Sequence, residues 1–132
     1  MRRPVMVFGV FDGLHEGHRA FLKTAKRLGD YLIVVVAPDS VVFRLKGQNP
    51  SRGVLDRMKS LRLEDRVDRV IKGDSRLGTY AAVKRFQPHV IALGYDQKAL
   101  AKDLRSRMPS VNVKMMQAHH PRKYHSRFLK KI

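Results

Sequence analysis

Two histidines, His15 and His18, have the spacing that most clearly indicates chemistry in this chain. They are three positions apart, so on a helical turn their imidazoles point to nearly the same side. Two imidazoles directed at one point could donate hydrogen bonds to a phosphoryl group whose charge grows in a transition state. Alternatively, the pair could be half of a metal site, although no third ligand has an obvious position, or two unrelated surface residues.

Both histidines lie in residues 9–18, which read GVFDGLHEGH and begin where an apolar run ends. Gly9 allows the backbone to turn sharply and to approach another group closely. Gly17 does the same directly before His18, where the start of a helix offers free backbone N–H groups to phosphate oxygens. The segment therefore predicts a phosphate-binding site between a strand and a helix.

Five apolar runs predict the strands that position this segment: residues 5–8, 31–37, 67–71, 90–93 and 111–116. Most are rich in Val and Ile, which is typical of parallel strands buried on both faces. Helical spacings of three and four occur between them, in residues 21–28, 54–61, 79–86 and 100–108. This alternation predicts the α/β class, as a single Rossmann-like, doubly wound domain over residues 1–132 with a five-stranded parallel sheet. Residues 38–52 show no such period and are predicted to form a long irregular loop.

The charge of the chain is strongly positive, with 28 Lys and Arg against 11 Asp and Glu, a net charge of +17. Such a field favours anionic partners: nucleic acid, a membrane surface or phosphorylated metabolites. It could also be a solvated surface without a dedicated partner. No RNA-recognition signature, zinc finger or basic heptad repeat singles out nucleic acid.

Two further absences limit the function. The chain contains no cysteine, which excludes disulfides, thiolate zinc sites and cysteine nucleophiles. No apolar run approaches the ~18 residues needed to cross a bilayer, and the first residues do not read as a signal peptide. A cytoplasmic protein without a membrane partner is therefore expected.

Residues 9–18 closely resemble the Gly-x-Phe-Asp-x-x-His-x-Gly-His signature of the cytidylyltransferase-like nucleotidyltransferases, with every fixed position present. Val10 departs from near relatives, which usually carry Thr; any hydroxyl contact is lost, but the backbone N–H is retained. The resemblance implies nucleotide contacts from these residues of the signature: Gly9, Val10, Phe11, His15, Glu16, Gly17 and His18.

The resemblance extends along the chain. Lys46 lies where relatives keep a lysine for the triphosphate, and Arg57 resembles an arginine in the helix before the family's Val-Asp-x-Val strand. Each could alternatively be a solvated basic residue. Residues 94–97 (GYDQ) end a predicted buried strand, and relatives use the aspartate matching Asp96 to contact the sugar or base of the nucleotide. Asp96 could also be a helix N-cap. The Gly-Tyr-Asp-Gln form most resembles the archaeal FAD synthases.

Residues 119–129 (HHPRKYHSRFL) correspond to a Ser/Thr-rich motif that opens the last helix of relatives and holds the β- and γ-phosphates. Ser126 is the counterpart, with Tyr124 near the nucleotide and Arg127 in place of a small hydroxyl residue. The Arg-Thr-x-Gly-Ile-Ser-Thr-Thr sequence of cytidylyltransferases is absent. This tail could otherwise be a solvated basic segment.

The implied reaction is attack by an acceptor phosphate on the α-phosphorus of a nucleoside triphosphate, with release of pyrophosphate. The resemblance implies these catalytic residues: His15 and His18 on the α-phosphate, Lys46 and Ser126 on the departing pyrophosphate. Mg²⁺ is expected as the cofactor, held mainly by the phosphates, with no protein metal ligand identified.

The Gly-Tyr-Asp-Gln segment and the tail favour ATP and FMN as substrates, giving FAD. The alternative is CTP with glycerol-3-phosphate or a sugar phosphate. Many relatives are dimers, so a homodimer is possible. A hypothesis of another class is a non-catalytic, basic nucleotide- or nucleic-acid-binding module, so nucleic acid stays open as a partner.

Overall fold

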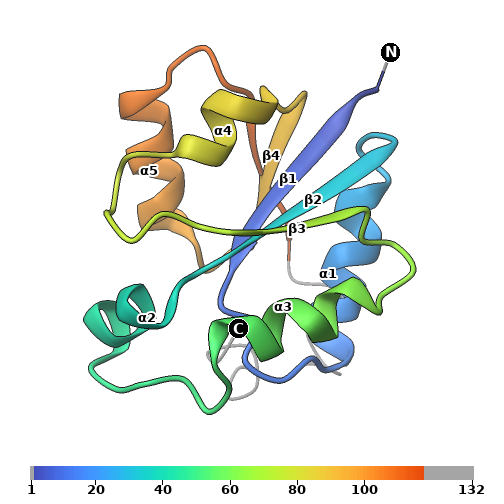
Figure 1. Ribbon diagram of the computed structural model, residues 1–132. Helices are drawn as coiled ribbons and strands as arrows, with labels where there is room; N and C mark the ends of the chain where they lie inside the picture. Colours follow the sequence, from blue (N-terminus) through green and yellow to red (C-terminus); the bar gives the residue numbers. More distant parts are fainter. Residues whose placement is uncertain (1, 118–132) are drawn as a thin grey trace.

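The computed structural model describes residues 2–117, and this part of the chain contains a five-stranded sheet in the order β3-β2-β1-β4-β5 (Figure 1). The strands are β1 (Pro4–Gly9), β2 (Tyr31–Val36), β3 (Arg69–Lys72), β4 (Val90–Leu93) and β5 (Val113–Met115). Each neighbouring pair is parallel. The α/β class and the five-stranded parallel sheet expected from the sequence are confirmed.

Helices cover both faces of the sheet (Figure 1). They are α1 (Glu16–Lys26), α2 (Asp39–Lys46), α3 (Val54–Arg62), α4 (Ala81–Phe86) and α5 (Lys98–Arg107). α1 and α3 pack on one face, α4 and α5 on the other, and α2 lies beyond the carboxyl end of β2. The turns at the carboxyl ends of the strands are therefore held in place by helices on both faces of the sheet.

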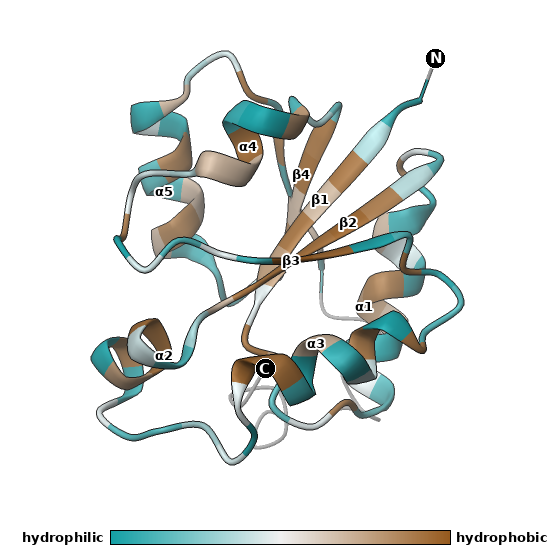
Figure 2. Cartoon of the chain, in the orientation of Figure 1, coloured by the Kyte–Doolittle hydropathy of each residue, from teal (hydrophilic) through white to brown (hydrophobic). Residues whose placement is uncertain are grey.

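The central strands are buried on both faces, which explains their nearly continuous apolar sequence. In β1, Val5 and Val7 belong to the core beneath α1 and α3, whereas Met6 belongs to the core beneath α4 and α5. All three side chains are completely buried. Figure 2 shows the same division, with hydrophobic strands inside and hydrophilic residues on the outer surfaces of the helices.

The order of the strands reverses at β1, which has β2 on one side and β4 on the other. Ligands of open α/β sheets bind at such a point, outside the carboxyl ends of the strands. Gln97 joins the two strand ends here: its Nε2 donates to the carbonyl of Phe8 at 2.9 Å, and its Oε1 accepts from the N–H of Gly94 at 2.8 Å. The amide of Gln97 thus ties the end of β1 to the residue that follows β4.

The expectation of an irregular loop over residues 38–52 is wrong for its first part, which forms α2. Only Val41 and Val42 are buried in this helix, while Phe43 and Leu45 are exposed. Adjacent buried residues give no three-or-four spacing, so the usual pattern for a helix is missing. The helix ends at Gly47, whose left-handed backbone (φ 74°) is typical of a helix C-terminus.

Candidate active site

The turn from β1 into α1 is built around a buried aromatic ring. Phe11 has φ 53°, a left-handed conformation that is unusual for a residue other than glycine. Its ring is buried, and the ring centroid lies 5.4 Å from that of His18. A Cβ on Gly9 would be 2.5 Å from Cε2 of Phe11. Glycine is therefore required at position 9, because any Cβ there would clash with the Phe11 ring. The close approach predicted for Gly9 is thus to this ring.

His15 and His18 lie together, as their spacing predicted. Their rings are stacked, with centroids 3.8 Å apart and an interplanar angle of 27°. His15 is the N-cap of α1: its Nδ1 accepts from the backbone N–H groups of Gly17 at 3.0 Å and His18 at 3.4 Å, while Nδ1 of His18 accepts from the N–H of His15 at 3.3 Å. This is a reciprocal capping box, so the alternative of two unrelated surface histidines is wrong.

The same contacts correct one expectation about the helix start. The N–H groups of Gly17 and His18 were expected to be free for phosphate oxygens, but both donate to Nδ1 of His15. The positive end of the helix dipole remains at this position. A ligand here would therefore receive hydrogen bonds from the imidazole rings instead of from these two backbone N–H groups.

The outer nitrogen of each imidazole is available for a ligand. Because each Nδ1 accepts an N–H, a neutral ring carries its proton on Nε2. Nε2 of His15 and Nε2 of His18 are buried and have no hydrogen-bond partner within residues 2–117. Buried polar groups are nearly always paired, so two unpaired donors side by side indicate a position for an acceptor-rich group.

Burial keeps both imidazoles neutral at physiological pH. Loss of hydration is the main reason that the pKa of His18 is lowered to about 4; a proton on His15 and the charges of Arg19 and Lys46 would lower it further, and the nearby carbonyl of Gly13, which makes no hydrogen bond to Nε2, opposes the change. Burial and then the charge of Arg19 lower the pKa of His15. The two rings are thus uncharged N–H donors rather than cations.

Lys46 and Asp96 lie outside the β1–α1 turn, and electrostatic interactions link Lys46 both to His18 and to Asp96. Lys46 is the last residue of α2, and its charge lowers the pKa of both His18 and Asp96. Loss of hydration is the larger influence on Asp96 and raises its pKa above the usual value. The N-cap of α5 is Gln97, so the interpretation of Asp96 as the N-cap is wrong.

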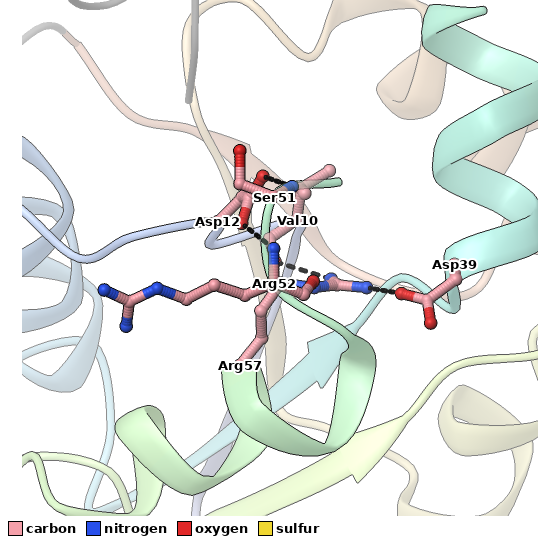
Figure 3. Close-up of polar contacts among 6 residues, drawn as sticks. All are labelled: Val10, Asp12, Asp39, Ser51, Arg52 and Arg57. Carbon is pink, nitrogen blue, oxygen red and sulfur yellow. Dashed lines mark hydrogen bonds and ion pairs between the residues drawn. The ribbon is translucent and has the colours of Figure 1, made fainter. Parts of the chain in front are cut away.

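Arg57 is completely buried in α3, so the alternative of a solvated helical residue is wrong. Its Nε donates to the carbonyl of Arg52 at 2.9 Å, and its Nη1 donates to the carbonyl of Val10 at 2.8 Å. Its Nη2 forms an ion pair with Oδ1 of Asp39, also at 2.8 Å (Figure 3). Val10 thus contributes to this network through its main-chain carbonyl.

Asp12 is a structural member of the site that the sequence reasoning did not single out. Its Oδ2 accepts from the N–H of Ser51 at 2.6 Å, and its Oδ1 accepts from the N–H of Arg52 at 2.9 Å (Figure 3). Its fixed place in the signature was the available signal. Glu16 is an exposed residue in the first turn of α1.

The predicted phosphate-binding tail follows residue 117, the last residue that the structure describes. Tyr124, Ser126 and Arg127 lie outside the described residues. Within residues 2–117, the site is formed by the β1–α1 turn, the end of α2, the turn after β4 and the buried face of α3.

The family model described as cytidylyltransferase-like matches residues 6–129, nearly the whole chain. The chain belongs to the cytidylyltransferase-like family. Among curated members, the FAD synthase of Pyrococcus abyssi is 43% identical over 114 residues, which cover 86% of this chain and 77% of that protein. The FAD synthase of Thermoplasma acidophilum is 40% identical over 111 residues, covering 83% and 75%. The similarity to archaeal FAD synthases and the nucleotidyltransferase class are thereby confirmed.

Two solved structures have a similar fold. One from Thermoplasma volcanium GSS1, described as a lipopolysaccharide core biosynthesis protein, is 37% identical, with a TM-score of 0.79 over 90% of this chain and 98% of that one. The pantoate-beta-alanine ligase of Francisella tularensis shares the fold at 18% identity, with a TM-score of 0.60 over 88% of this chain and 59% of that one. Within residues 2–117, none of the helices is long and apolar enough to span a bilayer.

Proposed function

We propose that this cytidylyltransferase-like enzyme transfers AMP from ATP to FMN, giving FAD and pyrophosphate. Relatives at 43% and 40% identity that bear the name FAD synthase support this choice of substrates. The observation that carries the chemistry is the pair of buried, unpaired Nε2 atoms on His15 and His18. They lie at the carboxyl edge of the sheet, where a bound nucleotide is expected.

In the proposed reaction, an oxygen of the FMN phosphate forms a bond to the α-phosphorus of ATP. The bond from that phosphorus to the bridging oxygen breaks, and pyrophosphate leaves. The attacking phosphate is already anionic, so the protein needs no general base. Catalysis consists of positioning and charge stabilisation, as is usual for transfers of this type. Nε2–H of His15 and of His18 would donate to oxygens of the α-phosphate as their charge grows.

Other residues would bind the pyrophosphate and the nucleoside of ATP. Lys46, close enough to His18 to influence its pKa, would meet the departing pyrophosphate together with Ser126 and Arg127. Asp96 and Tyr124 would contact the nucleoside. The turn around the histidines would enclose the α-phosphate through these residues: Gly9, Val10, Phe11, Glu16 and Gly17.

We also propose Mg²⁺ as the divalent cation. Among the side chains of residues 2–117, no group of three His, Cys, Asp or Glu is arranged to hold a metal. The proposed ion would be carried chiefly by triphosphate oxygens, because Mg²⁺ keeps several waters and needs few carboxylates. When bound, such an ion supplies positive charge to the phosphates.

The test is pyrophosphate release from ATP or CTP, each combined in turn with FMN, glycerol-3-phosphate and phosphopantetheine. We expect release with ATP and FMN, accompanied by the appearance of FAD on chromatography. Release only with CTP and glycerol-3-phosphate would replace the proposed substrates. A homodimer, proposed because many relatives are dimers, is tested on the same preparation by light scattering.

A sugar-phosphate acceptor is the second candidate. The structure from Thermoplasma volcanium that bears the lipopolysaccharide description is 37% identical to this chain. Adding a heptose phosphate to the same assay separates the two candidates. If no acceptor releases pyrophosphate and RNA affinity falls steeply with salt, the +17 chain is instead a nucleic-acid-binding module.

A further inference from the structure

The helix that carries Lys46 has little apolar packing to fix it. Val41 and Val42 are the buried residues of α2, whereas Phe43 and Leu45 are 51% and 63% exposed. An eight-residue helix gains most of its stability from packing, since so short a helix is marginal by itself. Polar interactions must therefore determine where the end of α2, and with it Lys46, lies; one of them is the hydrogen bond that the guanidinium of Arg44 donates to the carbonyl of Ser75.

Polar contacts hold this helix at its beginning and in the loop that follows it. At the beginning, Asp39 is paired with the guanidinium of Arg57 at 2.8 Å. In the loop, Ser51 and Arg52 donate their backbone N–H groups to the carboxylate of Asp12. α2 is thus attached through these contacts to α3 and to the turn that contains the signature.

Arg57 connects all three parts through one buried group. Besides Asp39, its guanidinium donates to the carbonyl of Arg52 in the loop and to the carbonyl of Val10 in the signature. Arg52 is therefore held through both its N–H and its carbonyl, by Asp12 and by Arg57 (Figure 3). The three acceptors come from segments that are distant in sequence.

The geometry of this contact requires arginine. A planar guanidinium presents its donors in a fixed fork, and the hydrogen bonds of Arg57 use Nε and both terminal nitrogens. A lysine offers a single nitrogen on a flexible chain and cannot reach three acceptors with that geometry. Removing the group would leave the two carbonyls without this donor and the half-exposed carboxylate of Asp39 without its cation.

We propose that Arg57 is a positioning residue: it sets Lys46 relative to His18 by holding α2, residues 47–53 and the signature turn together, without touching the nucleotide. This replaces the expectation that Arg57 binds the nucleotide directly. The inference rests on the proposed function, in which Lys46 meets the departing pyrophosphate.

The first experiment is amide hydrogen exchange, which needs no substrate. We expect Arg57→Lys and Asp39→Asn to accelerate exchange in residues 39–53, while α5 exchanges as in the wild type. Arg62→Met removes an exposed arginine from the same helix and is the matched control, in which exchange stays unchanged. Unaltered protection of residues 39–53 in both variants would overturn the proposal, whether or not the protein makes FAD.

The second experiment is a double-mutant cycle on kcat and on KM for ATP. Arg57→Lys should lower kcat/KM about tenfold or more in the wild type, but should have little further effect when Lys46 is already Met, because it acts through Lys46. Equal fold losses in the two backgrounds would contradict the proposal and indicate an independent role. If the wild type makes no FAD from ATP and FMN, the proposed function fails, and the exchange result still decides the structural claim.

Discussion

Nδ1 of His15 and Nδ1 of His18 each accept a hydrogen bond from the backbone N–H of the other residue, at 3.4 Å and 3.3 Å. Each ring therefore has one nitrogen that caps α1 and another, Nε2, that is free to serve a ligand. The two tasks lie on opposite sides of the imidazole. Substitutions can consequently separate helix capping from the proposed chemistry.

We expect His18→Asn to lose activity and keep stability. The Oδ1 of asparagine can take the place of Nδ1 and still accept from the N–H of His15, but nothing replaces Nε2–H. Loss of one well-placed donor should lower kcat by about 10²–10³. FAD formation and thermal unfolding, measured on the same preparation, check this prediction.

His18→Gln is the complementary control, because its terminal amide can reach the place of Nε2–H while the cap acceptor is lost. It should retain more activity than His18→Asn and should unfold more easily, by about 1 kcal/mol. Full activity in His18→Asn would remove the role proposed for the imidazole.

The lowered pKa of His18 predicts a pH-dependent stability. Its pKa is about 4 in the folded protein and near 6.5 in the unfolded chain, so between these values the unfolded chain binds more protons. The stabilising contribution is complete above pH 6.5 and is lost as the pH falls toward 4. Urea unfolding between pH 7 and pH 4.5 should show a steeper loss in the wild type than in His18→Asn; equal slopes would contradict this account.

Gly9→Ala should disturb the histidine pair through Phe11. The new Cβ would lie 2.5 Å from a ring that is buried and contacts His18, so the ring must move. We expect a loss of about 1–3 kcal/mol in the free energy of unfolding, typical of overpacking, together with lower kcat/KM. Gly78→Ala is the control, because Gly78 also has a left-handed backbone (φ 85°), but a Cβ there would meet Arg107 instead of Phe11. Gly78→Ala should lower the free energy of unfolding without lowering kcat/KM. An equal fall in kcat/KM in both variants would argue against a specific effect of Gly9→Ala through Phe11.

Gln97→Glu tests the connection between β1 and β4. A carboxylate oxygen would replace the Nε2 donor and face the carbonyl of Phe8, leaving two acceptors without a proton between them. The expected cost is about 1–3 kcal/mol in unfolding free energy, with reduced activity because the end of β1 carries the signature turn. Lys98→Gln, at the exposed neighbouring position, should leave both measurements unchanged. Chemical denaturation and FAD formation supply the comparison, and wild-type behaviour of Gln97→Glu would refute it.

Burial on both faces is why so much of the sheet could be predicted. Residues 90–93 were predicted as a strand and form β4 with the same bounds, and all four residues are buried. The edge strands β3 and β5 are less buried, so an apolar run marks their ends less closely: residues 111–116 were predicted, whereas β5 is Val113–Met115. α2 was missed because polar contacts, rather than a periodic apolar face, hold it.

The candidate site also has a part that the sequence could predict and a part that it could not. His15 and His18 are close in sequence, so local helix geometry was sufficient to bring their rings together. The environment of Arg57 depends on Val10, 47 positions away, and on Asp39, 18 positions away. Its acceptors include main-chain carbonyls, which have no sequence signature. A residue pattern therefore could not distinguish this buried arginine from a solvated one.

The side chains of Arg57 and Asp12 hydrogen-bond to main-chain atoms of Val10, Ser51 and Arg52. Figure 3 shows the side chain of Arg52 extending away from the guanidinium of Arg57. Every amino acid has a carbonyl, and every one except proline has an N–H. Mutation can therefore replace these side chains while the path of the chain is kept. The side chains at positions 10, 51 and 52 can vary, while the hydrogen bonds that join the signature turn to the loop after α2 and to α3 remain in place.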